Sequence, residues 1–368
     1  MTGLVPAPAQ IRLPSPVSAT AFSESGLLAI ATEDGTLRLY QAPYTKVWKA
    51  IKDLGAEISS IVFPASAGED ASVWVACEQQ VFCFDIKNSG MITAKKDALT
   101  ELRLTEEEDD VINQIAINFS QLAYTLDSGA VGVLDLQNLE KRVMKTRHSN
   151  LCTSISFIPD RPREIVSAGY DYTLLHFDFP LGSLLSSFQI SAPEPSSQVS
   201  LSPPFIQSLS LSANGLVACG LADGRIWFGS GGEKATTTDK NSSSRKKKRR
   251  KWEGLRSNDG NYFNVAEGPI VGIAFVTPDR LIALTLLGTL SLYEIKDGAI
   301  SRKISTVESP GLAKANALAV SQTHTVVGGL DSEKKGLFLL WEYASLQENG
   351  DGEHKEIVDD ISKLSVEV

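Results

Sequence analysis

The sequence predicts an all-β fold: a seven-bladed propeller in which each blade is a four-stranded antiparallel sheet. Short runs of alternating apolar and polar residues, bounded by Gly, Pro, Asp and Ser, recur along most of the chain. Such runs are typical of antiparallel strands joined by turns. The runs also recur as one unit, seven times over, and radial repetition of a small sheet builds a propeller.

The repeat is clearest at its first strand, which aligns in all seven copies without gaps. The fourth residue of this strand is mostly Ile or Leu, and the sixth is always apolar. Each copy continues with a second strand rich in small residues and a third strand that ends in an aromatic or apolar residue. The seven first strands are residues 17–22, 58–63, 112–117, 152–157, 206–211, 270–275 and 315–320.

The third strands end in pairs that resemble Trp-Asp, such as Phe177-Asp178 and Trp341-Glu342. Units of about 40–45 residues with this ending follow the WD40 pattern. We therefore expect residues 1–344 to form a single propeller. A short strand at residues 10–13 is expected to pair with the last third strand, 336–341, because the seventh blade otherwise has an exposed edge.

Three segments stand outside the repeat. Residues 231–259 form a basic insertion that is expected to be disordered, and its core, 232–254, is expected to bury nothing because apolar residues are scarce in it. Residues 345–368 form an acidic C-terminal tail. The carboxylate-rich stretch 101–110 is expected to be a solvated loop, with a contact for a basic partner as the alternative.

Composition narrows the class of protein. The longest apolar runs have the length of strands, so no membrane span is predicted. The N-terminal residues lack a basic region followed by an apolar one, so no secretory signal is predicted either. The four cysteines lie in predicted strands without a CxxC pair, which favours buried, reduced thiols in an intracellular protein.

No catalytic motif is present in the sequence. HExxH, GxSxG, a P-loop and a GxGxxG after a strand are all absent, and no His/Cys cluster has metal-ligand spacing. The sequence therefore predicts a protein that is not an enzyme and that needs no cofactor or metal. A propeller hydrolase using Ser167, His148 and Asp171 is a remote alternative, because Ser167 is predicted inside a strand rather than on an exposed turn.

The densest charge in the chain is a basic run, whereas the whole chain has a net charge of −9. Such a run predicts a nuclear-import signal read by an import receptor, or a contact with nucleic acid. Nucleic acid is the less favoured partner, because Trp252 is the one aromatic residue beside the run and an acidic propeller repels phosphates. The run consists of Arg245, Lys246, Lys247, Lys248, Arg249, Arg250 and Lys251.

The chain resembles the WD40-repeat propeller family, and most closely the family of WD repeat-containing protein fifty-three. The resemblance is carried by residues 147–152, 156–157, 161–162 and 166–171. WD40 blades contain a hydrogen-bonded chain of a His before the first strand, a Ser or Thr on the second, an Asp in the next turn and a Trp on the third. The resemblance implies that His148, Ser167 and Asp171 form this chain in the fourth blade, with His176 or Phe177 in the Trp position.

The same resemblance implies a partner. WD40 proteins of this kind are regarded as candidate substrate receptors of the cullin-4 ubiquitin ligase, and they dock on its propeller adaptor through a W-D-x-R/K ending. Residues 84–87 and 293–296 are degenerate versions of that ending, in which Lys cannot copy the bidentate fork of Arg. The candidate docking residues are Asp85, Lys87, Glu294 and Lys296.

Taken together, these features predict a non-catalytic protein-interaction scaffold of the nucleus and cytoplasm, with substrate receptor of a cullin-4 type ligase as its specific role. It would bind proteins through the rims of the propeller and would not bind membranes. The alternative is a nuclear RNA- or chromatin-associated factor that uses the basic run. Salt-dependent nucleic-acid binding separates the two hypotheses.

Overall fold

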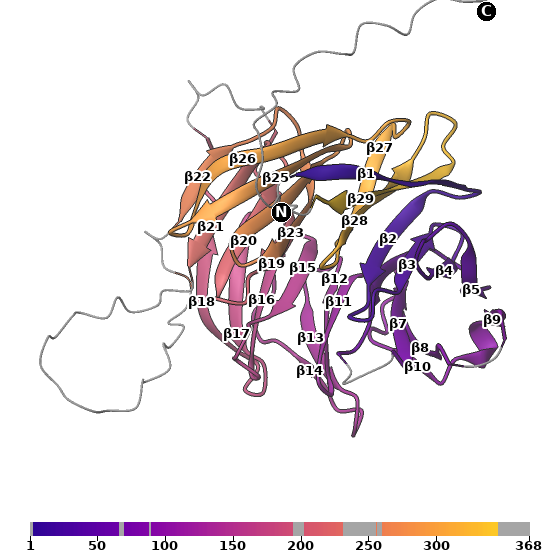
Figure 1. Ribbon diagram of the computed structural model, residues 1–368. Helices are drawn as coiled ribbons and strands as arrows, with labels where there is room; N and C mark the ends of the chain where they lie inside the picture. Colours follow the sequence, from indigo (N-terminus) through magenta and orange to yellow (C-terminus); the bar gives the residue numbers. More distant parts are fainter. Residues whose placement is uncertain are drawn as a thin grey trace, which may run out of the picture.

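The computed structural model describes residues 3–65, 70–87, 90–193, 202–230, 255 and 260–344. These residues form seven antiparallel sheets arranged as a ring of blades, as the sequence predicts (Figure 1). The first strands of neighbouring blades contact one another around the ring. Within the described residues one short helical segment occurs, the 3-10 turn η1 (Lys95–Asp97), and no helix is long and apolar enough to cross a membrane.

The first four blades are built from strands that follow one another along the chain. Blade 1 contains β2 (Val17–Phe22), β3 (Leu28–Thr32), β4 (Thr36–Tyr40) and β5 (Val47–Lys52). Blade 2 contains β6 (Ile58–Val62), β7 (Ser72–Cys77), β8 (Gln80–Asp85) and β10 (Thr100–Arg103). Blade 3 contains β11 (Ile112–Asn118), β12 (Gln121–Leu126), β13 (Val131–Asp135) and β14 (Lys141–Val143). Blade 4 contains β15 (Cys152–Phe157), β16 (Glu164–Gly169), β17 (Thr173–Asp178) and β18 (Ser183–Gln189).

The last three blades follow the same plan, except that the outer strand of blade 7 comes from the start of the chain. Blade 5 contains β19 (Ile206–Leu211), β20 (Leu216–Leu221), β21 (Arg225–Ser230) and β22 (Asn261–Asn264). Blade 6 contains β23 (Ile270–Thr277), β24 (Arg280–Thr285), β25 (Thr289–Lys296) and β26 (Ala299–Glu308). Blade 7 contains β27 (Lys314–Val320), β28 (His324–Leu330), β29 (Gly336–Tyr343) and β1 (Leu4–Leu13).

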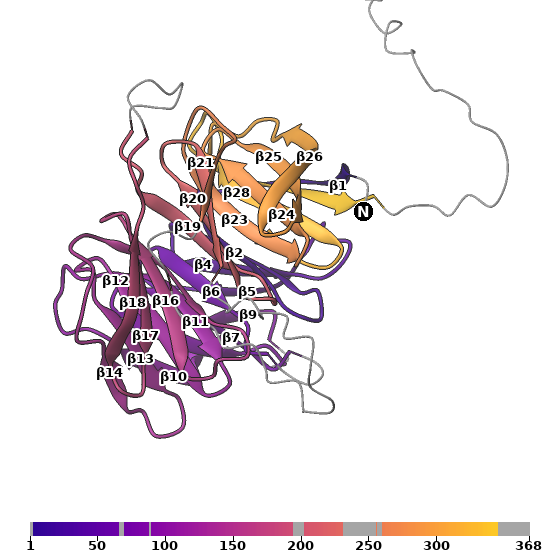
Figure 2. The ribbon, with the colours of Figure 1, turned by 90° about the vertical axis from the view of Figure 1, so that its left-hand side faces the viewer.

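The predicted closure of the ring by the N-terminal strand is confirmed. β1 pairs antiparallel with β29, with Gln10 opposite Leu339 and Leu13 opposite Gly336 (Figure 1). The strand is longer than predicted, because pairing resumes beyond an irregularity and reaches Leu4. Figure 2 shows β1 lying beside β26, the outer strand of blade 6, as well. The first and last strands of the chain thus share one sheet, which removes an open edge.

Blade 1 has a fifth strand that the repeat does not predict. The connection between β8 and β10 of blade 2 reaches back to blade 1, where β9 (Ile92–Ala94) pairs in parallel with β5. Lys49 of β5 is buried there, and its ammonium group donates to the carbonyl of Ile86 at 2.9 Å. The connection therefore covers the outer edge of the neighbouring sheet.

The apolar core lies between the blades. Seven clusters of buried apolar side chains occur, and each is formed by the facing sheets of two adjacent blades. Between blades 1 and 2, for example, Leu37 and Leu39 pack with Phe82 and Phe84. Burial of one such side chain stabilises the fold by roughly 1.5–3 kcal/mol. Each blade buries its apolar side chains against its two neighbours, so the stability of the ring depends on every interface between blades.

Each first strand carries a β-bulge near its start. In six blades the register to the second strand shifts between the first and third residues of the first strand, and in blade 7, where β27 begins at Lys314, it shifts between the second and fourth. A bulge leaves one residue out of the ladder and redirects its side chain. The bulged residues are Ser18, Ser59, Asn113, Thr153, Gln207, Val271 and Asn316.

The bulged side chains connect neighbouring blades. Ser18 donates to the carbonyl of Ile58 at 2.8 Å, and Thr153 donates to the carbonyl of Ile206 at 2.8 Å. Equivalent bonds run from blade 2 to 3, from 3 to 4 and from 7 to 1; from blade 5 to 6 the neighbouring Ser208 supplies one. Among the described residues no such bond joins blade 6 to blade 7, where the bulged residue is Val271.

Leu255, the one described residue of the predicted insertion 231–259, packs against the propeller. Leu255 is buried in the cluster between blades 4 and 5, and its backbone N–H donates to Ser186 Oγ at 2.8 Å. The stretch that is expected to bury nothing, 232–254, lies outside the described residues, whereas Leu255, within the insertion that is expected to be disordered, has a site between two blades. The basic run 245–251 and the acidic tail 345–368 lie outside the described residues.

Candidate functional site

The turns of the blades form the two faces of the ring. We name the four strands of each blade A to D, from the first to the last. The AB and CD turns of all blades lie on one face, the AB/CD face, because equivalent strands run in the same sense. The BC turns and the connections between blades form the opposite DA/BC face. Loops on such a rigid frame are where binding residues are usually found.

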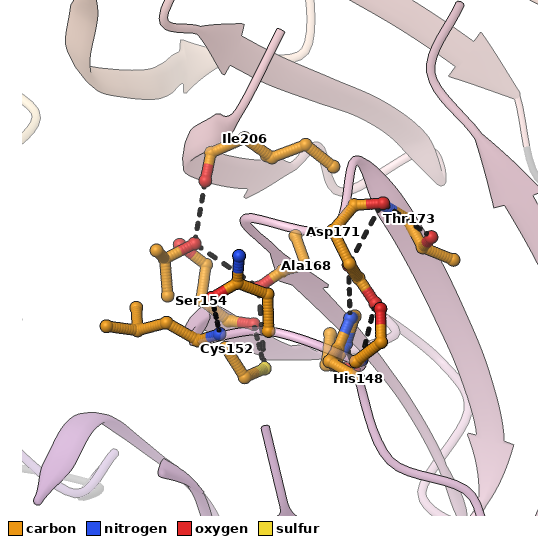
Figure 3. Close-up of polar contacts among 12 residues, drawn as sticks. His148, Cys152, Ser154, Ala168, Asp171, Thr173 and Ile206 are labelled. Carbon is orange, nitrogen blue, oxygen red and sulfur yellow. Dashed lines mark hydrogen bonds and ion pairs between the residues drawn. The ribbon is translucent and has the colours of Figure 1, made fainter. Parts of the chain in front are cut away.

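His148 lies at the centre of a buried polar chain in blade 4. Its Nδ1 is 2.9 Å from Asp171 Oδ1 and its Nε2 is 2.8 Å from Ser167 Oγ (Figure 3). Burial raises the pKa of the Asp171 carboxyl, but the hydrogen bonds from His148, Ser149 and Thr173 outweigh this effect and hold the pKa below its usual value. The chain ties β16 to the segment before β15 and to the turn before β17.

The third-strand position that holds a Trp in the hydrogen-bonded chain of WD40 blades is taken here by His176 or Phe177, and both have other roles. Phe177 is fully buried in the core between blades 3 and 4, and His176 makes its bonds elsewhere. The Ser167 hydroxyl instead reaches the Cys152 thiol, whose pKa burial raises. Ser167 is 0% exposed, so a substrate cannot reach its hydroxyl. The geometry is that of a structural hydrogen-bond chain rather than of a hydrolase triad.

His176 belongs to a second polar chain, which the sequence did not indicate. Its Nε2 is 3.0 Å from Glu164 Oε2, and its Nδ1 is 3.1 Å from Ser186 Oγ. Because the Glu164 carboxylate can only accept, a neutral His176 carries its proton on Nε2 and donates it to Glu164. Nδ1 then accepts the hydroxyl proton of Ser186, whose oxygen accepts the N–H of Leu255. Burial and the positive charge of Arg161 lower the pKa of His176 to about 3.

Three of the Asp residues at the equivalent BC turns stabilise their own turns. Asp34, Asp223 and Asp331 each accept a hydrogen bond from the backbone N–H two residues further on, as expected for Asx-type turns. Asp127 instead accepts a hydrogen bond from Asn113 Nδ2, on the first strand of blade 3, at 3.0 Å. Within the described residues no group of three or more His, Cys, Asp and Glu side chains is placed to hold a metal ion.

The first pair of candidate adaptor-docking residues lies on the AB/CD face of blade 2. Asp85 ends β8, and its Oδ1 accepts a hydrogen bond from the backbone N–H of Lys87 at 2.7 Å. The carboxylate therefore shapes the turn, while the Lys87 side chain is exposed.

The second pair lies on the same face of blade 6. Glu294 is engaged by two arginines, Arg302 at 2.8 Å and Arg280 at 3.2 Å, and these bonds lower its pKa. Lys296 ends β25 and is exposed. Blades 2 and 6 are not neighbours in the ring, so the structure does not bring the two pairs together.

A groove on the AB/CD face lies between blades 3 and 4. It has a volume of about 660 Å³ and is lined by the end of β11, the end of β15 and the turn that follows each. Phe119, in the two-residue turn between β11 and β12, is 87% exposed and has a φ of 52°. Positive φ is rare for a bulky side chain, and such backbone strain is concentrated at functional positions.

A second pocket continues the groove toward the outside of the ring. It has a volume of about 280 Å³, and its lining includes Val133, Arg142, Phe179 and Pro180. Pro162 lines both spaces, so they lie next to each other, and we call them together the blade 3/4 track. Sequence reasoning missed this surface. Its one local signal is Phe119, an aromatic residue in a two-residue hairpin turn that usually takes Asn or Gly.

Comparisons with known proteins agree with this architecture. No family model matches the chain. The chain is similar to the WD repeat-containing protein 53 homolog of Dictyostelium discoideum, with 23% identity over 228 residues. This match covers 56% of the chain and spans 60% of the length of that relative.

A solved structure shows the fold independently. The β-propeller domain of Cps50 (Swd1) from Myceliophteria thermophila superimposes with a TM-score of 0.68 and 14% sequence identity. The superposition covers 93% of this chain and 100% of that domain. The resemblance to WD40 propellers that the sequence predicts is thereby confirmed.

Proposed function

Starting from a chain with the WD40 β-propeller fold, we propose that it is a non-catalytic protein-interaction scaffold. Similarity to WD40 propellers supports this role. The observation that carries it is the blade 3/4 track, where a rigid ring holds an exposed aromatic side chain beside a groove. A monomeric protein has little reason to keep Phe119 in solvent in a strained turn, whereas an interface gains from an aromatic anchor.

The specific role that we propose is that of a substrate receptor of a cullin-4 type ubiquitin ligase, docked to its adaptor through the AB/CD face. Lys87 and Lys296 support this proposal, because both are exposed at the ends of third strands on that face. The bonds to Asp85 and Glu294 hold the two turns in place. A charged contact that is desolvated in an interface contributes roughly 2–4 kcal/mol as a hot spot.

Charge reversal tests the docking proposal. The double variant Lys87→Glu, Lys296→Glu is expected to lose co-purification of the cullin-4 adaptor from cells while keeping the melting curve of the unmutated protein. Lys334→Glu, an exposed lysine in a BC turn on the opposite face, is the matched control and should keep the adaptor. If the unmutated chain never recovers the adaptor, the receptor role fails; if the double variant recovers it equally, docking uses another surface.

The second proposal is that the basic run 245–251 is a nuclear-import signal, which places the protein in nucleus and cytoplasm. The run supports this by its charge density and by its position four residues before the anchored Leu255. Replacement of the seven residues by Ser and Gly should move the protein toward the cytoplasm at equal expression. An unchanged distribution rules out the import role, and salt-dependent RNA binding that the replacement abolishes favours a nucleic-acid contact instead.

A further inference from the structure

Exposed apolar side chains gather on blades 3 and 4. Half of the large apolar side chains that are exposed in the described part of the chain belong to these two blades. Several of them lie outside the groove, at the outer end of the blade 3/4 track. Contiguous exposed apolar surface on a soluble protein usually marks an interaction site. The members on blades 3 and 4 are Phe119, Leu139, Val143, Leu181, Leu184 and Leu185.

Hydrogen bonds hold part of this surface together across the two blades. Arg142 of β14 donates to the carbonyl of Pro180 at 2.6 Å, and the N–H of Lys145 donates to the carbonyl of Gly182 at 3.1 Å. The CD turn of blade 4 is therefore fixed against the outer strand of blade 3. We name the combined surface of Leu139, Arg142, Val143, Lys145 and Leu181 the blade 3/4 edge.

The blade 3/4 edge is basic in an acidic protein. Residues 140–147 contain four basic side chains and one acidic side chain, whereas the whole chain has a net charge of −9. Glu140 is bonded to Arg142 at 2.9 Å, and Lys145 is exposed. The pocket of about 280 Å³ opens beside these cations, because Arg142 and Pro180 line it. Its lining also includes the carboxylates of Asp135 and Glu140 and the buried side chains of Val133 and Phe179.

The mixture of cations and exposed apolar side chains on the blade 3/4 edge is not explained by protection of a sheet edge against pairing with other chains. Lysines on an edge strand discourage pairing with other chains, and β26 of blade 6 shows that use, with exposed Arg302 and Lys303. However, no large apolar side chain of β26 is among the exposed ones in the described part of the chain. The blade 3/4 edge combines cations with exposed Leu and Val, which a purely protective edge avoids.

We propose that the blade 3/4 edge binds an acidic polypeptide segment that carries at least one large apolar residue. The acidic residues face Arg142 and Lys145, and the apolar side chain packs against the exposed Val143 and Leu181. Charge complementarity selects the acidic partner and steers its approach. A nucleic acid fits less well, because Leu139, Val143 and Leu181 offer no ring on which a base can stack. The inference rests on the proposed scaffold function, for which it supplies a partner chemistry.

A random peptide library displayed on phage, selected on the folded full-length protein, tests the proposal. Enriched peptides should be acidic and contain a large apolar residue, and their binding should weaken as salt is raised. In anisotropy titrations, the single variant Lys145→Glu and the double variant Val143→Ser, Leu181→Ser should each bind the enriched peptides at least tenfold more weakly than the native chain. Lys303→Glu, a cation on the outer strand of blade 6, is the matched control and should leave binding unchanged. Melting curves check that each variant folds.

The proposal is overturned by no enrichment above the bare support, by enriched peptides without acidic residues, or by equal binding to the edge variants. Enrichment that arises only when residues 345–368 are removed overturns it in favour of the chain's own acidic tail. Equally edge-dependent binding of a mixed-sequence single-stranded RNA 20-mer overturns it in favour of nucleic acid. Failure of this proposal is distinguished from failure of the receptor role by measuring adaptor co-purification on the same edge variants. Lys87 and Lys296 are intact in these variants, so they should still recover the adaptor if the receptor role is correct.

Discussion

Asn316 in blade 7 donates a hydrogen bond from its side-chain Nδ2 to the carbonyl oxygen of Val17 in blade 1, at 3.0 Å. The two residues are 299 positions apart in the sequence. Ser18 and Thr153 make equivalent bonds between consecutive blades, and the Asn316 bond is the counterpart between the last blade and the first. Together with the pairing of β1 and β29, it joins the two ends of the chain in two different layers of the ring.

Replacement of Asn316 by Ala should therefore destabilise the closed ring. The carbonyl of Val17 would lose its partner in a partly buried place, at a cost of about 1–3 kcal/mol. Urea unfolding measures the change as a lower midpoint. Asn264→Ala, at an exposed position on the outer strand β22, is the control and should unfold at the original midpoint. Equal midpoints for both variants would show that the bond carries no net stability.

Replacement of Val271 by Thr should have the opposite effect. Val271 is the bulged residue of blade 6, where no side-chain bond to blade 7 is present among the described residues. Thr has nearly the same shape and can donate to the carbonyl of Ala315, the equivalent acceptor, with a net gain of about 1 kcal/mol. Thermal unfolding should show a higher midpoint for Val271→Thr than for the native chain. A lower midpoint contradicts the expected bond.

Deletion of residues 1–14 should open the ring at blade 7. It removes the whole of β1, its ladder to β29, and the buried side chains of Leu4 and Leu13. The expected loss is several kcal/mol, because both hydrogen bonds and apolar burial disappear. Deletion of residues 1–2 alone spares β1 and is the control. An unchanged melting temperature in the longer deletion would be inconsistent with ring closure by this strand.

Replacement of His176 by Gln should reduce the acid sensitivity of the fold. Burial lowers the pKa of His176 to about 3, whereas an unfolded His titrates near pH 6.5. Between these values the unfolded chain binds a proton that the folded chain does not. The stability is therefore complete above about pH 6.5 and is lost as pH falls toward 3, at up to about 1.4 kcal/mol per pH unit. Urea midpoints from pH 7 to pH 4 should fall less steeply in the variant; parallel curves would contradict the shift.

The sequence alone determined the architecture, because its signals are local and repeated. Alternating runs such as 152–157 indicate strands wherever they lie, and seven copies leave one ring as the natural solution. The closing strand was also predictable, since an unpaired last blade requires an outer strand and residues 10–13 were free to supply it. His148, Ser167 and Asp171 could be named because their residue types recur in WD40 blades at matching places.

Only the tertiary structure decided which surfaces the propeller offers. The blade 3/4 track joins Phe119 to Pro180, residues on different blades, and no local pattern reports that two turns meet. The ordered Leu255 was invisible for the same reason, since its site is built by Phe188 and Trp227 of two other segments. Strand patterns depend on neighbours in the sequence, whereas pockets and edges depend on neighbours in space, and those exist only once the ring has closed.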